Sequence, residues 1–346
     1  MDGIFRRARS DMLSVIIVNY NSGHRLARCL DHLSRQSFRD FEILIFDNAS
    51  TDESLALAAA ATPDARIMRS AANLGFAAAN NRAAQEARGG WLVFLNPDAY
   101  AETDWLTALD AATRTYPGVD AFGSTQLDAA DASRVDGAGD VLHVLGIAYR
   151  GHFGGASEKL PDEGECLSPC AAAAMYRKAA FDALGGFDER FFCYGEDVDL
   201  GLRLRLAGGR TVQLRSARVH HEGSGVTGRH SDFSVYHGHR NRIWLVRKNF
   251  PGLLFWGGLP FRILTDGLLL ARLAALGRFR AGLRALLDGH FGGGPIRASA
   301  CNDRRTRRIS LAAFAAMLAW SPSALVARRA KVWSVDPSLA SPRRAD

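Results

Sequence analysis

The sequence predicts an α/β protein built on a doubly wound, mostly parallel sheet, followed by a helical, amphipathic C-terminal extension. Along the first hundred residues, short runs of apolar residues recur. Each run is followed by a segment whose apolar residues repeat every three to four positions, as they do on one face of a helix. Strands that are apolar on both faces and alternate with helices form parallel sheets covered on both sides.

The elements follow in order from residue 13, after a basic N-terminal tail at 1–11. A continuous apolar run at 13–18 predicts the first strand, and residues 23–36 then place Leu26, Leu30 and Leu33 on one helical face. The same pattern predicts strands at 41–46, 65–68 and 91–95, and helices at 54–61 and 77–87. We expect one domain over 12–250 and an extension over 251–346.

The composition excludes several classes of protein. A chain of 346 residues with 47% hydrophobic side chains can bury a sizeable core. The net charge of +7 comes from the C-terminal part, since residues 260–346 hold 15 Lys and Arg against five Asp and Glu. That part is amphipathic, which favours an anionic membrane surface over nucleic acid as its partner. The five cysteines form no even framework and no paired CxxC motifs, so a reducing compartment fits best.

Polar residues follow three of the predicted strands. Asn19, Tyr20 and Asn21 come after the first strand, residues 47–52 after the second, and 96–98 after the fourth. In open α/β sheets, ligands bind beyond the carboxyl ends of the strands, so these clusters should converge on one site.

These clusters suggest nucleotide and metal contacts. Tyr20 could stack on a nucleobase, Asp47 and Asn48 could bind its edge or the ribose, and Asp98 could bind a divalent cation that holds a diphosphate. Alternatively, Asn-Pro-Asp is a turn and Ser50 or Thr51 caps a helix.

A second acidic cluster lies in the other half of the chain. Glu196 and Asp197 follow an aromatic segment and open a helix predicted to reach residue 207. A carboxylate in an aromatic pocket can act as a general base on a sugar hydroxyl. The alternative is helix capping. His220 and His221 follow a short strand and are either metal or phosphate contacts or structural, and Cys166 and Cys170 are interpreted as packing residues.

Together these motifs resemble family 2 glycosyltransferases over residues 12–250, and in particular the branch with rhamnosyltransferases of O-antigen, capsule and mycobacterial-type wall assembly. The motifs that carry the resemblance are VNYN at 18–21, DNASTD at 47–52, NLGFAAANN at 73–81, LNPD at 95–98, GGFDERFF at 185–192, YGEDVDLGLRLRLAG at 194–208, and a Tyr…Arg-Asn…Arg-Lys segment at Tyr236, Arg240, Asn241, Arg247 and Lys248.

The resemblance implies the GT-A fold and an inverting transfer from a nucleotide-diphospho-sugar, with Mg²⁺ or Mn²⁺ as cofactor. It implies Asp98 and His220 as metal ligands, Asp197 as the catalytic base and Glu196 as an acceptor contact. Asn96 replaces the first acid of the family's Asp-x-Asp motif. The implied nucleotide-binding residues are Asn19, Tyr20, Asn21, Asp47, Asn48, Asn73, Gly75, Asn80 and Asn96.

The extension is expected to associate with the membrane. Residues 250–279 are apolar but interrupted by Arg262, Asp266, Arg272 and Arg278, which fits a pair of interfacial helices better than a span. Residues 309–327 are uncharged and could just cross a bilayer, pack as a soluble helix or attach peripherally, and we favour peripheral attachment. We therefore expect a cytoplasmic enzyme, peripheral at the inner face of the plasma membrane.

The expected donor is linked to dTDP or UDP, with L-rhamnose as the leading sugar, and the acceptor is a saccharide or a polyprenyl-diphosphate-linked sugar of a cell-envelope polysaccharide. One alternative is a sugar-nucleotide nucleotidyltransferase, which needs a glycine-rich basic loop where this chain has NYNSGHR. The other is a non-catalytic membrane module that binds a nucleotide sugar. The acidic motifs LNPD and EDVD argue against it.

Overall fold

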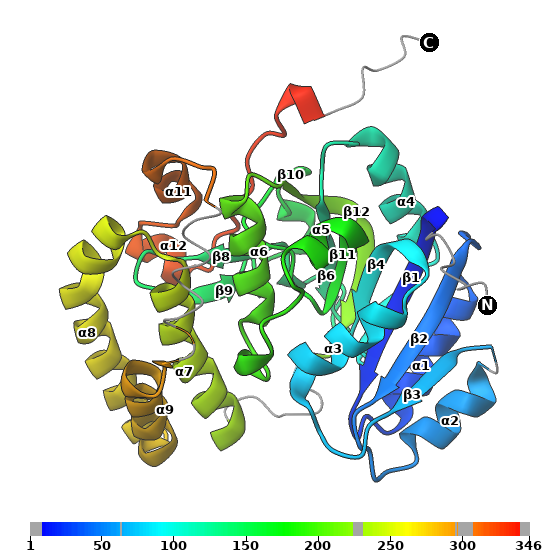
Figure 1. The fold of residues 1–346 in the computed structure, drawn as a ribbon, viewed down its shortest axis with the longest axis horizontal. Helices are drawn as coiled ribbons and strands as arrows, with labels where there is room; N and C mark the ends of the chain where they lie inside the picture. Colours follow the sequence, from blue (N-terminus) through cyan, green and yellow to red (C-terminus); the bar gives the residue numbers. More distant parts are fainter. Residues whose placement is uncertain (1–8, 63, 224–230, 295, 297–306, 340–346) are drawn as a thin grey trace, which may run out of the picture.

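The computed structural model describes residues 9–62, 64–223, 231–294, 296 and 307–339 (Figure 1). Four parallel strands form the first half of the central sheet, in the order β4, β1, β2, β3. The strands are β1 (Arg9–Asn19), β2 (Phe41–Asp47), β3 (Arg66–Arg69) and β4 (Gly89–Leu95). The helices between them are α1 (His24–Ser34), α2 (Ser54–Ala61) and α3 (Gly75–Glu86). The predicted alternation of strands and helices is confirmed.

The second half of the sheet is mixed. Strand β11 (Ala173–Arg177) pairs antiparallel with β4 and β6 (Ala121–Asp128), and β12 (Thr211–His221) runs parallel to β6. The shorter strands β10 (Gly164–Glu165), β5 (Ala99–Ala101) and β7 (Val135–Gly137) extend its edges. A separate hairpin pairs β8 (Asp140–Leu142) with β9 (Ala148–Arg150). The remaining elements of this half are α4 (Trp105–Thr115), η1 (Ser157–Lys159), α5 (Lys178–Ala183), η2 (Glu189–Phe191) and α6 (Glu196–Leu206).

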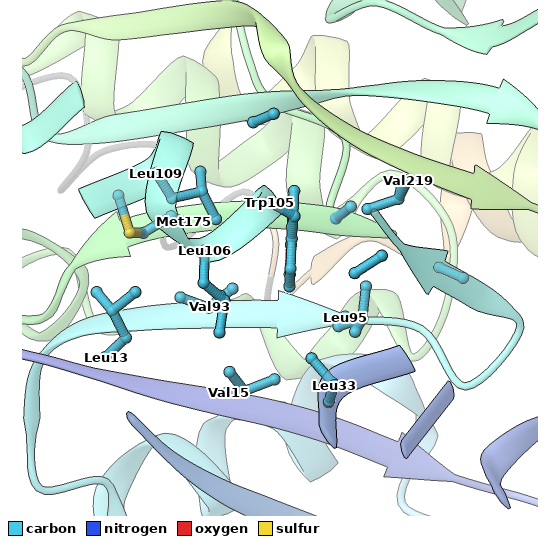
Figure 2. Packing of buried hydrophobic residues seen from close by; sticks show 14 of the residues in the cluster. Leu13, Val15, Leu33, Val93, Leu95, Trp105, Leu106, Leu109, Met175 and Val219 are labelled. Carbon is cyan, nitrogen blue, oxygen red and sulfur yellow. The ribbon is translucent and has the colours of Figure 1, made fainter. Parts of the chain in front are cut away.

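Apolar side chains pack against both faces of the sheet. On one face, Leu13 and Val15 of β1 and Val93 of β4 contact α1 and α4, where Trp105 is fully buried (Figure 2). On the other face, alternate residues of the same strands pack against α3, α5 and α6. Each fully buried side chain of this size contributes roughly 1.5–3 kcal/mol. This packing fixes where the strands end, and therefore where the polar residues that follow them lie.

The C-terminal helices gather at the end of the molecule away from β2 and β3 (Figure 1). They are α7 (Asp232–Asn249), α8 (Gly252–Ala275), α9 (Phe279–Phe291), α11 (Leu311–Met317) and α12 (Pro322–Val326), with η3 (Pro337–Leu339) at the end of the described chain. By length and composition alone, α8 is long and apolar enough to cross a membrane, with a mean hydropathy of 1.3 over its most apolar window.

Residues 309–327 do not form one continuous helix. They form α11 and α12, and Phe314 and Leu318 are fully buried against a cluster that includes Phe250 and Trp244. The chain then returns to the central sheet, where the Trp333 amide donates to Glu165 O at 3.0 Å and the Glu165 amide donates to Trp333 O at 2.7 Å. The last part of the extension therefore packs on the main domain.

Candidate active site

A cavity of about 490 Å³ lies at the carboxyl ends of β1, β2 and β4. Six of the residues predicted to bind nucleotide or metal line it, namely Tyr20, Asn48, Asn73, Gly75, Asn96 and Asp98. The opposite wall comes from the loop before α6 and from Arg150, His221 and Phe233. The strand ends thus converge as the sheet topology predicts.

Two asparagines tie the loop after β2 to the start of α3. Asn48 Nδ2 donates to Asn73 Oδ1 at 2.8 Å, and the Leu74 amide donates to Asn48 Oδ1 at 2.8 Å. Gly75 then has a φ of 81°, and a Cβ there would lie 2.6 Å from Phe192 O. Glycine is required at this position because the loop before α6 approaches the backbone so closely.

Asn19, Asn21, Asp47 and Asn80, also predicted to bind nucleotide, do not line the cavity. Asn19 is buried, and its Nδ2 donates to Asp47 Oδ1 at 2.9 Å and to Ser54 Oγ at 2.8 Å. Asn21 Oδ1 accepts from the Thr51 amide at 2.8 Å, and Asn80 Nδ2 donates to the Phe76 carbonyl in its own helix. The Asn19 and Asn21 side chains thus join β1 and its loop to β2, α2 and the loop between them, whereas Asn80 bonds within α3.

Asp98 and His221 form a pair suited to a divalent cation. Asp98 Oδ1 lies 3.3 Å from His221 Nε2, and both side chains are at least 93% buried. His221 Nε2 makes no hydrogen bond, while Nδ1 lies 2.7 Å from Asp136 Oδ2. A carboxylate on the second ring nitrogen is the usual support of a metal-binding histidine, because it fixes the ring and its tautomer. An oxygen and a nitrogen donor at one point fit Mn²⁺ or a related ion.

His220, the expected ligand, lies elsewhere. Its Nε2 is 3.2 Å from Glu102 Oε1, whereas the histidine in contact with Asp98 is His221. Successive side chains of a strand point to opposite faces, and this alternation along β12 separates the two histidines. Burial lowers the pKa of His221, but the Asp136 carboxylate at Nδ1 and the Asp98 carboxylate beside Nε2 outweigh burial and raise the pKa.

Arg150, on β9, brings positive charge to the cavity. It pairs with Asp136, and its field also acts on Asp140 and Asp197. Sequence reasoning missed Arg150, Asp136 and Asp140, since the region between β6 and β10 shows no helical or strand periodicity. The one available signal was the pair of acids among glycines in VDGAGD at 135–140.

The loop before α6 is held in an unusual conformation. Phe192, Tyr194 and Gly195 all have positive φ, at 65°, 73° and 86°. Asn241 Nδ2 donates to three carbonyls of this loop, those of Phe191, Cys193 and Tyr194, at 2.7–2.9 Å. Two left-handed non-glycine residues are costly, and they persist only where surrounding contacts impose them. Asn241, from the predicted Arg-Asn motif on α7, supplies those contacts.

Glu196 and Asp197 open α6 directly after this loop. The Asp197 carboxylate accepts from the Ala171 amide at 3.1 Å and from the Val198 amide at 2.8 Å. Burial raises the pKa of Asp197, and these hydrogen bonds and Arg150 offset the increase only in part. Burial and the charge of Asp197 raise the pKa of Glu196 well above its ordinary value. Of the two, Asp197 is therefore better placed to ionise and act as a base.

Neither acid lines the cavity at the strand ends, which they adjoin through Tyr194 and Arg150. Asp197 instead lies beside the buried Asp140 and Cys170, and the ligand-type atoms of these three residues are all within 4.8 Å of one another. Burial raises the pKa of the Cys170 thiol to about 12. The Asp98 and His221 pair lines the cavity, whereas Asp140, Cys170 and Asp197 do not, so the pair is better placed for a cation that binds a diphosphate there.

Comparison with known proteins agrees with this geometry. The family model described as Glycosyl transferase family 2 matches residues 14–185. The N-acetylglucosaminyl-diphospho-decaprenol L-rhamnosyltransferase of Mycobacterium tuberculosis (strain CDC 1551 / Oshkosh) is 32% identical over 294 residues, covering 76% of this chain and 92% of that protein. The O-antigen biosynthesis protein RfbC of Myxococcus xanthus is 33% identical over 225 residues, covering 60% of this chain and 17% of that protein.

Solved structures share the fold. The mannosyltransferase PcManGT from Pyrobaculum calidifontis, in complex with GDP-Man and Mn²⁺, superposes with a TM-score of 0.53 at 18% identity, covering 86% of this chain and 85% of that one. GalNAc-T7 with UDP, GalNAc and Mn²⁺ gives a TM-score of 0.55 at 18% identity, and the match covers 69% of this chain and about half, 48%, of that chain. The fold is therefore GT-A, and the protein belongs to glycosyl transferase family 2.

Proposed function

We propose that this glycosyltransferase is metal-dependent and inverting, and that it moves a sugar, with L-rhamnose as the leading candidate, from a dTDP- or UDP-linked donor to a lipid-linked saccharide. The observation that carries the proposal is the Asp98 and His221 pair, which lies in one cavity with Asn48, Asn73 and Tyr20. The M. tuberculosis relative, named for a diphospho-decaprenol acceptor and L-rhamnose, supports the choice of substrates.

In this proposal the chain holds the donor between two walls. Tyr20 offers an aromatic face to the nucleobase of the donor, and Asn48 and Asn73 border the nucleoside. Asp98 and His221 would hold Mg²⁺ or Mn²⁺, which neutralises charge on the leaving diphosphate. Arg150 adds a fixed positive charge to the same wall.

Asp197 is the proposed base. It would take the proton of the acceptor hydroxyl as that oxygen attacks the anomeric carbon opposite the diphosphate, so that one displacement inverts the configuration. Its carboxylate is fixed by two backbone amides, which orients it without a further side chain. The buried Glu196, with one carboxylate oxygen unpaired, is the proposed acceptor contact beside it.

Membrane attachment is proposed from the inverted polarity of α8. Two of its three charged residues, Arg262 and Asp266, are buried, and Asp266 pairs with Arg242 of α7 and with His290 of α9. Leu264 and Leu268 point outward instead and are 63% and 65% exposed. A soluble helix places these residue types the other way round. An exposed apolar face of this size is typical of a membrane interface, here the cytoplasmic one, where nucleotide sugars are found.

The test is hydrolysis of UDP-, dTDP- and GDP-sugars by the purified protein with Mn²⁺, beside Asp98→Ala and Asp197→Asn. We expect one donor to be hydrolysed, Asp98→Ala to lose about 10²–10³-fold of the rate, and Asp197→Asn to bind the donor but fail in transfer. Thermal unfolding of each variant serves as the control for folding. If no donor binds even with metal, the proposal is wrong.

A further inference from the structure

A second cavity, of about 430 Å³, adjoins the donor cavity, and Tyr194 lines both. It lies between α7, the C-terminal half of α8 and the turn before β9. We propose that it binds the diphosphate of a lipid-linked acceptor. This proposal rests on the proposed function, because it assumes that the acceptor is a saccharide linked through a diphosphate.

The charges around the cavity suit an anion. Its positively charged lining residues are Arg242, Arg272 and Arg328, His239 also lines it, and among the described residues no Asp or Glu does. Arg272 makes no hydrogen bond or ion pair within the described part of the chain. Phosphate oxygens accept strong, charge-assisted hydrogen bonds from guanidinium groups of this kind.

Arg242, which lines this cavity and also a neighbouring one between α7, α8 and α9, provides a buried donor. Its side chain is only 9% exposed, and although one end pairs with Asp266, its Nε has no hydrogen-bond partner. A buried N–H without a partner is costly, so it favours a ligand that can accept from it. Burial and the charge of Arg242 also lower the pKa of His239 to about 4, which keeps that ring neutral and able to donate one hydrogen bond.

The position of the cavity matches the order of groups in such an acceptor. Leu264, Leu268, Arg272 and Leu276 are spaced by four residues and so form one row along α8. The row begins on the exposed apolar face and ends at Arg272 and Leu276, which line the cavity. At its other side the cavity meets Tyr194 and Gly195, directly before Glu196 and Asp197. A lipid tail, its diphosphate and its sugar would therefore lie in sequence from the membrane to the base.

The deciding variant is Arg272→Gln, with Arg272→Lys as a charge-preserving variant and Arg280→Gln as the matched control. Arg280 is also exposed but lies on α9, outside the cavity lining. Two acceptors are compared in detergent, farnesyl-diphosphate-linked N-acetylglucosamine and the phosphate-free octyl N-acetylglucosaminide. Donor hydrolysis without acceptor is measured in parallel.

We expect Arg272→Gln to raise KM for the diphosphate acceptor about tenfold with little change in kcat, and Arg272→Lys to restore part of it. In Arg272→Gln, KM for the octyl glycoside and the rate of donor hydrolysis should be unchanged. In Arg280→Gln, KM for both acceptors should equal that of the wild type. Equal effects on both acceptors, or no effect on either, would overturn the proposal.

Two further outcomes separate the possible sources of the phosphate. If Arg272→Gln weakens binding to phosphatidylglycerol vesicles but leaves KM for the farnesyl acceptor unchanged, Arg272 binds general anionic lipid and the proposal is wrong. If the wild type glycosylates the octyl glycoside as well as the farnesyl acceptor, this proposal fails while the proposed function stands. If the wild type hydrolyses no donor and glycosylates neither acceptor, the proposed function itself fails.

Discussion

Strands β1 to β4, the proposed donor half of the sheet, and helices α7 to α9 place their polar and apolar residues in opposite ways. In β1, β2 and β4 the apolar side chains are buried and the polar residues follow at the strand ends, where they surround a cavity. In α8, Arg262 and Asp266 are buried, whereas Leu264 and Leu268 are exposed. The first arrangement is typical of a protein surrounded by water, and the second supports the proposed contact of α8 with a membrane surface. The two regions meet at Tyr194, which lines a cavity on each side.

The largest expected effect is a difference in Mn²⁺ affinity between variants of the two neighbouring histidines of β12. We expect His221→Ala to weaken Mn²⁺ binding at least 10–100-fold, because it removes a buried nitrogen donor next to Asp98. His220→Ala, which loses only a contact with Glu102, is the matched control and should bind Mn²⁺ normally. Calorimetric titration of both variants with Mn²⁺ measures this difference. If His220→Ala weakened Mn²⁺ binding more than His221→Ala, the cation would lie on the other face of β12.

The boundary between the two regions depends on Asn241. Asn241→Asp keeps the size of the side chain but removes the amide that donates to three carbonyls of the 191–194 loop. We expect kcat to fall about tenfold and the free energy of unfolding to fall by about 1–3 kcal/mol, since buried carbonyls lose their donor.

Steady-state kinetics and urea unfolding of Asn241→Asp give the two values. Donor affinity should change less than kcat, because Asn241 does not itself line the donor cavity. A variant that loses stability with an unchanged kcat would show that the loop conformation does not position the acid pair.

The exposed apolar face of α8 should affect binding to anionic vesicles but not the thermal stability of the protein. Replacing Leu264 and Leu268 together by serine should lower the fraction bound to anionic vesicles roughly tenfold, because each leucine no longer transfers apolar surface to lipid. Thermal stability should change little, as both side chains are exposed. Leu57→Ser on α2, another exposed leucine, is the control. Vesicle flotation that is unchanged in the double variant would contradict a lipid-facing α8.

The smallest expected effect is on the pH profile of kcat. Burial raises the pKa of Asp197, so the base becomes protonated, and kcat falls, as the pH decreases through a value above the ordinary carboxyl range near 4. The profile is measured at saturating Mn²⁺, because His221 also titrates and would otherwise change metal occupancy. A kcat that stays constant down to about pH 4 would contradict the role of Asp197.

The donor half could be read from the sequence, because periodicity and sheet topology determine where polar residues at strand ends lie. Tyr20, Asn48, Asn73, Gly75 and Asp98 were predicted in this way or through the family resemblance, and they line one cavity, while their roles in binding stay predictions. A sequence gives no such register for β12, where a shift of one residue exchanges the faces of His220 and His221. It also gives no signal for Arg150, whose position depends on the packing of a short hairpin.

The C-terminal region was predicted less completely. The amphipathic character of residues 250–279 indicated an interfacial helix, but not that Arg262 and Asp266 would turn inward, because that depends on partners in α7 and α9. The uncharged segment at 309–327 left a span possible. Its two short helices bury Phe314 and Leu318 against the main domain instead. Composition alone could not distinguish a lipid-facing segment from one covered by protein.

The backbone pairing of Trp333 with Glu165 has a consequence for protein engineering. Because the chain returns to the central sheet after the helical region, truncation at residue 250 would leave Glu165 of β10 without its Trp333 partner and also uncover the apolar surface under Phe314. A soluble fragment for crystallisation is therefore better obtained by polar substitutions on the outer face of α8 than by shortening the chain.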